Sequence, residues 1–226
     1  FTGSDSWVIL SPIEQSIKRK IEAVGVPLKD WDIQINYGIK TGYNDAFIIS
    51  TEKRNEILAN CKDADERKRT EELIRPILRG RDIKRYGYEW ANLWIINTHN
   101  GIKGKLPRID VNEYPAIKAH LDQFWDKISK RADKGDTPYN LRNCAYMEDF
   151  NKPKIIWKII GNRLGFALEN KKMILNNACY ILTCSDGGLE YLEAMLNSNA
   201  ILWYSFVTNM NKTGVGDMQV GEQNIN

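Results

Sequence analysis

Histidine and cysteine are scarce in this chain. Its 226 residues include only two histidines, His99 and His120, and these lack the spacing of metal ligands. The four cysteines contain no Cys-x-x-Cys pair, so the sequence predicts neither a zinc module nor a thiol redox motif. We expect reduced, structural thiols, which favours a cytoplasmic location.

The motifs of familiar catalytic sites are absent as well. The sequence has no Gly-x-Ser-x-Gly, no His-Glu-x-x-His, no Walker loop and no glycine-rich cofactor loop, which excludes the common hydrolase, metalloprotease and nucleotide sites. It also lacks the Asn-Pro-Pro-Tyr motif of amino-methyltransferases and any recognisable nuclease pairing of acidic residues. No apolar run approaches the ~20 residues that a membrane span requires. We therefore expect no catalytic residue, no metal ligand and no membrane partner.

Positive charge is present but unevenly placed. The net charge is only +3, yet residues 151–175 carry six lysines or arginines and one acidic residue, whereas residues 176–226 carry one lysine and five acidic residues. Such an asymmetry favours a local polyanion-binding face over general affinity for polyanions.

The most concentrated basic segment runs from Arg79 to Arg85, with Arg81 and Lys84 inside it. Arginine forks suit phosphate oxygens and the paired acceptors of guanine, so the segment is a candidate nucleic-acid contact. A solvated basic loop or a set of surface ion pairs is the alternative interpretation, with Asp82 as the available anion.

Two turns are further candidates. In the turn from Lys40 to Asn44, Lys40 could meet a phosphate, Thr41 could donate to one, and Asn44 could read a base edge or hold the turn. The basic turn Lys158–Arg163 adds Arg163. Because Asn, Gly and Thr build turns without any ligand, a structural role remains open for both.

The order of the patterns predicts an α+β fold in which strands and hairpins are interspersed with helices. Ser11 and Glu14 form a capping box for a first helix, whose buried face should include Ile13, Ile17, Ile21 and Val24. Pro76 is expected to close a helical stretch in two pieces that begins at residue 51, with Thr51 and Asp63 as candidate caps. One long helix should run over 115–131, with His120 packed on it or at its surface. Strands are expected at residues 7–10, 33–37 paired in a hairpin with 46–49, 93–97, 154–160, 164–168 and 178–183, and the last helices at 189–196 and 201–207.

The motifs in their order resemble a known family. Tyr37-Gly38-Ile39-Lys40-Thr41-Gly42-Tyr43-Asn44-Asp45-Ala46-Phe47 is followed by Arg75-Pro76-Ile77-Leu78-Arg79-Gly80-Arg81-Asp82-Ile83, then by Leu93-Trp94-Ile95-Ile96, Lys152-Pro153-Lys154-Ile155-Ile156-Trp157 and Leu196-Asn197-Ser198. This series is similar to the TaqI-like C-terminal specificity domain. That domain is the target-recognition part of N6-adenine DNA methyltransferases and of type IIG or IIS restriction-modification enzymes.

The resemblance implies a role in reading double-stranded DNA. In that family a separate domain binds S-adenosylmethionine and methylates a flipped adenine, so S-adenosylmethionine and magnesium are expected only for catalytic domains absent from this chain. The DNA-binding residues that we expect are Lys40, Thr41, Asn44, Arg79, Arg81, Lys84, Arg85 and Arg163. The alternative is a specificity subunit that docks a separate methyltransferase chain.

The resemblance also suggests a division of the chain. Residues 1–32 would link to a catalytic domain of the same parent protein, residues 33–211 would form the DNA target-recognition domain, and residues 212–226 would be a loose or truncated tail.

Overall fold

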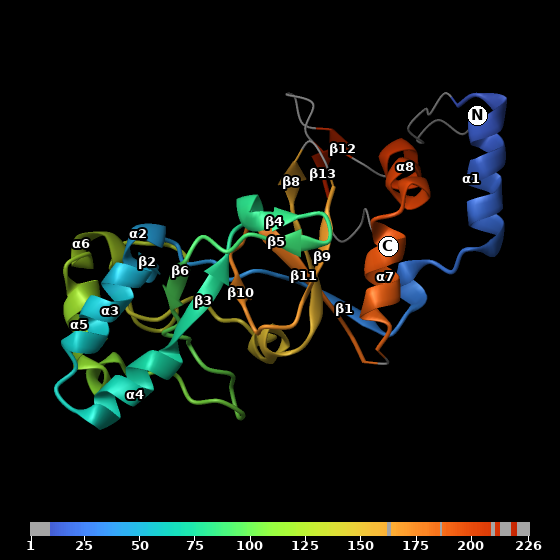
Figure 1. Cartoon of the computed structure of the whole chain (residues 1–226). Helices are drawn as coiled ribbons and strands as arrows, with labels where there is room; N and C mark the ends of the chain where they lie inside the picture. The colour runs from blue at the N-terminus through green and yellow to red at the C-terminus, as the bar shows by residue number, and fades with distance from the viewer. Residues whose placement is uncertain (1–9, 162–163, 186, 209–210, 213–217, 221–226) are drawn as a thin grey trace.

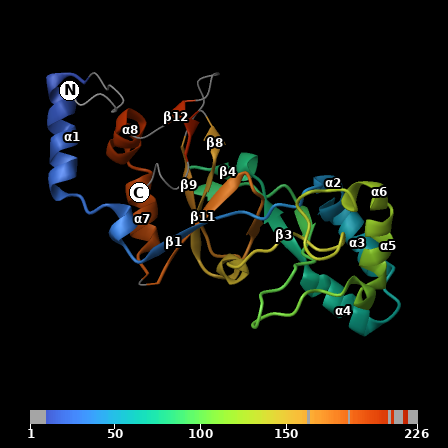
Figure 2. The same ribbon diagram turned by 180° about the vertical axis from the view of Figure 1, so that it is seen from behind.

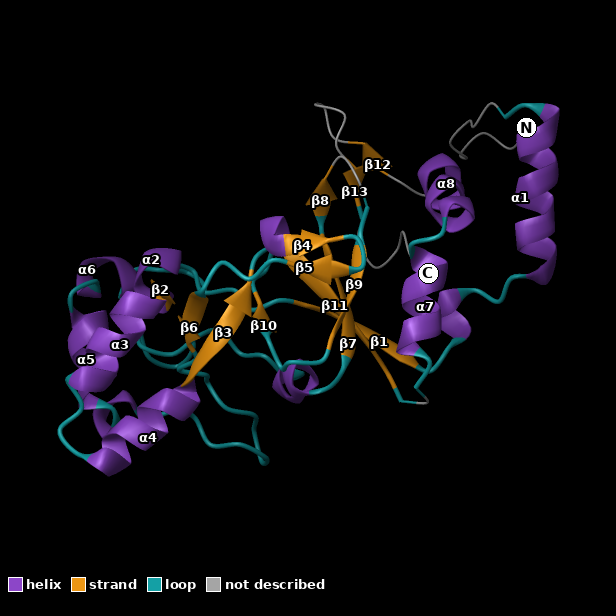
Figure 3. Cartoon of the chain, viewed as in Figure 1, coloured by secondary structure: helices purple, strands orange, loops and turns teal. Residues whose placement is uncertain are grey.

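The computed structural model describes residues 10–161, 164–185, 187–208, 211–212 and 218–220, and its fold is α+β, as predicted (Figure 3). The helices are α1 (Pro12–Val24), α2 (Asn44–Phe47), α3 (Thr51–Ala59), α4 (Ala64–Leu73), α5 (Pro115–Asp122), α6 (Trp125–Ile128), α7 (Leu189–Leu196) and α8 (Asn199–Thr208). The strands are β1 (Ile33–Tyr37), β2 (Ile48–Ser50), β3 (Ile74–Leu78), β4 (Ile83–Lys84), β5 (Gly87–Tyr88), β6 (Leu93–Ile96), β7 (Lys154–Lys158), β8 (Ile160–Gly161), β9 (Phe166–Glu169), β10 (Ile174–Leu175), β11 (Cys179–Cys184), β12 (Asn211–Lys212) and β13 (Met218–Gln219).

One antiparallel sheet, with the strand order β1-β11-β7-β9, is buried on both faces at its centre. In β7 the side chain of Ile156 joins one core cluster, while Ile155 and Trp157 join the other. Adjacent residues of a strand point to opposite faces, so a strand covered on both sides becomes a continuous apolar run. Trp157 is fully buried and stacks on Tyr180 at 5.3 Å between ring centroids, as expected for a core residue.

The second four-stranded sheet has the order β10-β3-β6-β2, and only the β10–β3 pair is parallel. Helices α3, α4, α5 and α6 gather at this end of the molecule, whereas α1, α7 and α8 lie at the opposite end, in both views (Figures 1 and 2). The two sheets therefore meet near the middle of the molecule's long axis, and helices lie at both of its ends.

A buried ion pair lies in the first sheet. Lys154 and Glu169 face each other in the β7–β9 register, and both side chains are fully buried. Lys154 also donates to the carbonyl of Phe150 at 2.9 Å, and Glu169 accepts from the backbone N–H of Met173 at 3.2 Å. The extra hydrogen bonds offset part of the cost of removing two charges from water.

Helix α1 forms as predicted, but its predicted burial is wrong. Ser11 and Glu14 make the capping box, yet no residue of the helix is buried, and the side chains of Ile13 and Val24 are 73% and 83% exposed. The helix contacts α8, where the Tyr204 hydroxyl donates to Glu22 at 3.1 Å. An apolar stripe indicates a face that gains from burial, but it does not say what covers that face.

The predicted hairpin of residues 33–37 with 46–49 is also wrong. Strand β1 pairs with β11, and residues 44–47 form helix α2 before β2 pairs with β6. The pairing with β11 places β1 beside the buried residues Tyr180, Ile181 and Leu182, and burial of apolar surface favours such a pairing between distant strands.

The helical stretch predicted to reach Pro76 ends earlier, at Leu73, because Ile74–Leu78 is strand β3. Within that stretch Asp63 caps α4 as expected, but Ser50 rather than Thr51 caps α3 by accepting from the Lys53 N–H. Strand β10 pairs with Ile77 and Leu78 of β3 and does not reach Pro76. Proline has no N–H to donate, so its place beyond the end of β10 costs no hydrogen bond to that strand.

The single long helix predicted over 115–131 is instead two helices, α5 and α6. The N–H of Phe124 bonds to the carbonyl of Leu121 at 3.0 Å, three residues back, which tightens the chain and stops the α-helical pattern. His120 is buried and its Nε2 lies 3.0 Å from the carbonyl oxygen of Ala46. The strand expected at residues 7–10 lies almost wholly outside the described residues.

Candidate nucleic-acid interface

Three connecting segments lie side by side where the two sheets meet. Residues 38–43 pass from β1 to α2, residues 176–178 pass from β10 to β11, and residues 79–82 follow β3. The backbone N–H of Ile39 bonds to Leu175 at 2.6 Å, and that of Asn176 bonds to Leu78 at 3.0 Å. The structure therefore places the two predicted contact motifs on either side of one turn, residues 176–178, which we call the asparagine turn.

Two glycines allow this close packing. A Cβ on Gly38 would lie 1.9 Å from the carbonyl oxygen of Asn176, and a Cβ on Gly80 would lie 3.2 Å from that of Ala178. Inside the turn, the Asn176 side-chain oxygen accepts from the N–H of Ala178 at 3.3 Å. The asparagine turn is thus fixed from both flanks and from within.

Replacing Gly38 with alanine should displace the asparagine turn, because the new methyl group would collide with backbone rather than with a movable side chain. We expect a loss of about 1–3 kcal/mol in the free energy of unfolding, as for other overpacked sites, measured by urea denaturation. Gly87→Ala is the matched control, because a Cβ there has no neighbour within 4 Å. Equal stability of the two variants would contradict the proposed packing role.

The Lys40–Asn44 turn is anchored from behind by Arg131. This arginine is buried, and its guanidinium donates to the carbonyls of Thr41, Asp133, Pro138 and Asn140 and lies over the Phe47 ring, 4.4 Å from its centroid. Burial lowers the pKa of Arg131 to about 10, so it stays charged at neutral pH. A buried cation with four acceptors holds a loop in one shape.

Within this turn the predicted contact residues have different surroundings. Thr41 is buried, and its hydroxyl donates to the Asn44 side chain at 2.6 Å. The ammonium of Lys40 is half exposed and pairs with Asp133 at 2.9 Å, and this pairing holds the pKa of Asp133 below its usual value. Asn44 is exposed at the start of α2. Lys40 and Asn44 thus face solvent, while Thr41 supports them.

The basic run beyond β3 has the same division of roles. Arg79 makes a bidentate pair with Asp82, with Nε and Nη2 at 3.1 Å and 2.8 Å from the carboxylate oxygens, and this bond raises the pKa of Arg79. The ion-pair alternative that the sequence left open is therefore observed for Arg79. The contact of Arg79 with DNA stays a prediction. It requires Arg79 to leave its ion pair with Asp82 and to bind DNA instead.

Arg81 lies at the tip of the run and is exposed, and within the described part of the chain it has no ion-pair partner. Lys84 is exposed and donates to the Arg81 carbonyl at 3.2 Å, with a long 3.8 Å approach to Glu89. Arg85 donates to the carbonyl of Asn197 at 2.6 Å, at the end of α7. Arg163 lies outside the described residues. Arg81 is the cation of the run with the most freedom to meet a ligand.

Sequence reasoning missed Asn177 at this junction, and it named Lys158 only as the start of a basic turn. Asn177 is exposed at the tip of the asparagine turn, and Lys158 has its Cβ 3.3 Å from the position a Cβ would take on Gly80. Neither makes a side-chain hydrogen bond or ion pair among the residues described. The Asn-Asn pair before a strand was a usable turn signal, but nothing in it revealed which chain segments would flank it.

Comparison with known families places this junction in context. The model of the TaqI-like C-terminal specificity domain matches residues 75–217, which include Arg79–Arg85, Lys158 and the asparagine turn. The chain belongs to this family. The Lys40–Asn44 turn precedes the matched segment, and the adjoining N–H groups of Gly38 and Ile39 bond to the carbonyls of Cys179 and Leu175, on either side of the asparagine turn.

Two relatives of this specificity domain are informative. The type II methyltransferase M.PaeR7I of Pseudomonas aeruginosa is 22% identical over 199 residues, 87% of this chain and 32% of that protein. The type IIL restriction-modification enzyme MmeI, solved in complex with DNA, matches with a TM-score of 0.59 at 14% identity, over 89% of this chain and 25% of that one. The chain thus spans a third or less of either relative, and its likeness to MmeI concerns the fold.

Proposed function

We propose that this chain is the sequence-specific double-stranded DNA recognition domain of a restriction-modification enzyme. It would position DNA for adenine-N6 methylation, for cleavage, or for both, by domains that this chain does not contain. The observation that carries the proposal is the junction itself: within a TaqI-like specificity domain, the motifs that carry Lys40 and Arg81 flank one turn whose exposed Asn177 has no side-chain partner among the described residues.

The side chains suggest a division of labour. Arg81 and Asn177 are exposed, and no described residue forms an ion pair with the Arg81 guanidinium or a hydrogen bond with the Asn177 side-chain amide. Guanidinium and amide groups bind guanine and adenine edges in pairs of hydrogen bonds. Lys40, Lys84 and Lys158 are better suited to phosphates, since an ammonium acts as a point charge. Phosphate contacts orient a protein on the duplex, and base contacts specify the sequence.

The proposal is tested by measuring the affinity of the chain for mixed-sequence duplex DNA over a range of salt concentrations. Each phosphate contact should contribute about 0.9 to the slope of log affinity against log salt. A steep slope supports DNA binding by cation contacts. Failure to bind duplex DNA even at low salt would refute it.

Replacing Arg81 with alanine should reduce discrimination by about 1–3 kcal/mol at one position of the preferred sequence. Lys40→Gln, in contrast, should weaken binding to all sequences alike and should make the slope of log affinity against log salt less steep by about 1. The measurement is competition between the preferred duplex and single-base variants. If the two substitutions have the same pattern of effects, the assignment of base and phosphate roles is wrong.

The partner within a parent protein would be a methyltransferase or nuclease domain, and S-adenosylmethionine and magnesium would bind there rather than to this chain. Helix α1 is the proposed link, and its exposed Ile13, Ile17 and Val24 would be covered by that domain. The division of the chain into a link of residues 1–32, a reader of residues 33–211 and a tail is part of this proposal.

The exposed apolar surface also favours a second candidate, a specificity subunit that docks a separate methyltransferase chain. Tyr191 and Met195 of α7 are 61% and 39% exposed, at the same end of the molecule as α1. Stable association with a methyltransferase chain, without duplex affinity of the domain alone, would favour docking over direct reading.

A further inference from the structure

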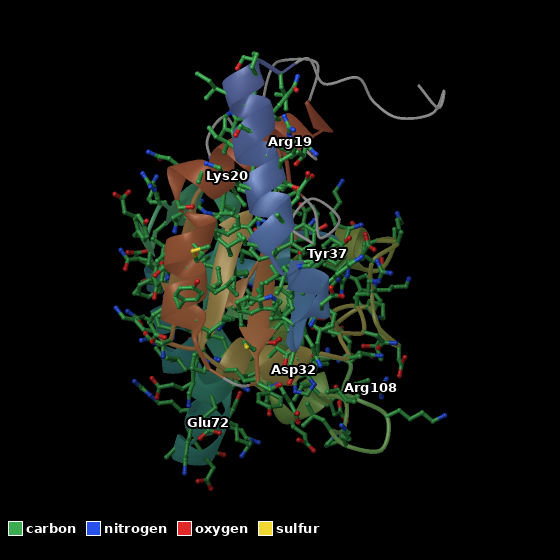
Figure 4. The ribbon with its side chains drawn as sticks, turned by 90° about the vertical axis from the view of Figure 1, so that its right-hand side faces the viewer. Arg19, Lys20, Asp32, Tyr37, Glu72 and Arg108 are labelled. Carbon is green, nitrogen blue, oxygen red and sulfur yellow. The ribbon has the colours of Figure 1, made fainter. Side chains whose placement is uncertain are left out.

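The loop from Gly101 to Arg108 is a built projection rather than a loose connection. The N–H of Ile102 bonds to the carbonyl of Leu106 at 2.8 Å, and the N–H groups of Lys105 and Leu106 both bond back to Ile102 at 2.9 Å. Gly101 and Gly104 have φ values of +74° and +77°, which glycine adopts without strain. The loop therefore has a defined shape, and it projects beyond the body in Figure 1 and beyond Arg108 in Figure 4.

This loop carries only positive charge. Lys103, Lys105 and Arg108 are all exposed, and the loop has no acidic residue. In the described part of the chain Lys103 and Lys105 have no ion pair, while Arg108 approaches Asp136 only at 3.9 Å. Three cations held close together repel one another, and an anion placed among them would relieve that repulsion.

A groove of about 880 Å³ lies beside the loop, between it and residues 136–145. Asn100, Asn143 and Ala145 line its other wall together with Asp136. Amide groups and cations on the walls of an open groove suit the oxygens of an extended phosphodiester backbone. The described residues that line the groove include no aromatic side chain on which a base would stack, so we assign it no role in reading bases.

Polar contacts link the Lys40 turn to one wall of this groove. Asp133 pairs with Lys40 at 2.9 Å and with Arg142 at 3.3 Å. The neighbouring Asn143 accepts from the side chain of Asn100, which also donates to Asp136 at 3.0 Å. Polar contacts thus lead from the Lys40 turn through Asp133 to Arg142, and from the adjacent Asn143 through Asn100 to the edge of the loop.

We propose that residues 101–108 and the groove beside them hold the phosphate backbone of duplex DNA that flanks the recognised sequence, without reading its bases. The inference rests on the proposed function, since it assigns the flanking part of the same DNA to a second surface. It makes the domain's affinity depend on duplex length, and it leaves sequence preference to Arg81 and Asn177.

The test compares two double variants with equal charge change. Lys103→Gln/Lys105→Gln removes two cations of the loop, and Arg19→Gln/Lys20→Gln removes two from α1, which Figure 4 shows far from Arg108. On a long duplex, the loop variant should make the slope of log affinity against log salt less steep by about 1.8, since each of the two lost phosphate contacts contributes about 0.9. It should enrich the same sequence as the unaltered chain, and a duplex trimmed to the recognised site should bind both equally.

The outcomes separate this inference from the function on which it rests. An unchanged slope in the loop variant, an equal loss in the α1 variant, or an altered sequence preference would overturn the role of the loop while leaving DNA recognition intact. If the unaltered chain binds no duplex, the proposed function fails and the loop's role with it.

Discussion

Replacing Lys154 with methionine should lower the free energy of unfolding by about 3–5 kcal/mol, the usual cost of leaving one member of a buried ion pair alone. Glu169 is fully buried, and without Lys154 its carboxylate would lose its ammonium partner, although the N–H groups of Lys171 and Met173 would still donate to it. Burial already lowers the pKa of Lys154, which shows how poorly solvated the pair is. Urea denaturation with an unchanged m-value measures the effect.

A double-mutant cycle isolates the pair. Glu169→Gln alone should also destabilise the domain, while Lys154→Met/Glu169→Gln should lose clearly less than the sum of the two single losses, because no unpaired charge remains. Lys53→Met is the matched control, since Lys53 pairs with Glu56 at 2.6 Å and the side chains of this pair are 37% and 56% exposed. Additive losses would contradict direct coupling of Lys154 and Glu169.

Replacing Arg131 with methionine should cost about 3 kcal/mol and should also weaken DNA binding. The substitution removes the Arg131 donor from the buried carbonyl of Thr41, whereas the carbonyl of Asn140 keeps the N–H of Gly135 at 2.9 Å. An unsatisfied buried acceptor costs about 1–3 kcal/mol. The Lys40–Asn44 turn would then lose the group that fixes it from behind. Stability is measured by urea denaturation, and affinity on the same samples in native buffer.

Two further variants make the Arg131 prediction specific. Arg131→Lys keeps the charge but not the planar fork, so it should recover only part of the stability. Arg142→Met, at an arginine whose side chain is 62% exposed and which pairs with the same Asp133, should change stability by less than about 1 kcal/mol. Similar losses for Arg131→Met and Arg142→Met would show that the buried anchor is not what holds the turn.

Local chemistry predicted the elements of this fold better than their partners. The capping box of α1, the cap at Asp63 and the span of α7 follow from a few neighbouring residues and were predicted. The pairing of β1 with β11 was not, because its register joins residues almost 150 positions apart. Such pairings are selected by which apolar surfaces cover each other, and periodicity alone does not contain that information.

The candidate site shows the same limit. Composition indicated Lys40, Arg79 and Arg81, but only the fold shows that the asparagine turn lies between them. Asn177 carried no distinguishing signal, since an asparagine in a turn is ordinary. The buried positions of Arg131 and Thr41 were equally hidden, because both residue types are usually exposed.

The most direct test of the central claim is selection from a pool of random-sequence duplexes, with the bound DNA sequenced. We expect the chain to enrich one short sequence, and Asn177→Ala to lose preference at a single position while Gly87→Ala keeps the full preference. Enrichment of no sequence, by a chain that still binds DNA, would contradict the account. An unaltered preference after both Arg81→Ala and Asn177→Ala would show that the junction is not the reading surface.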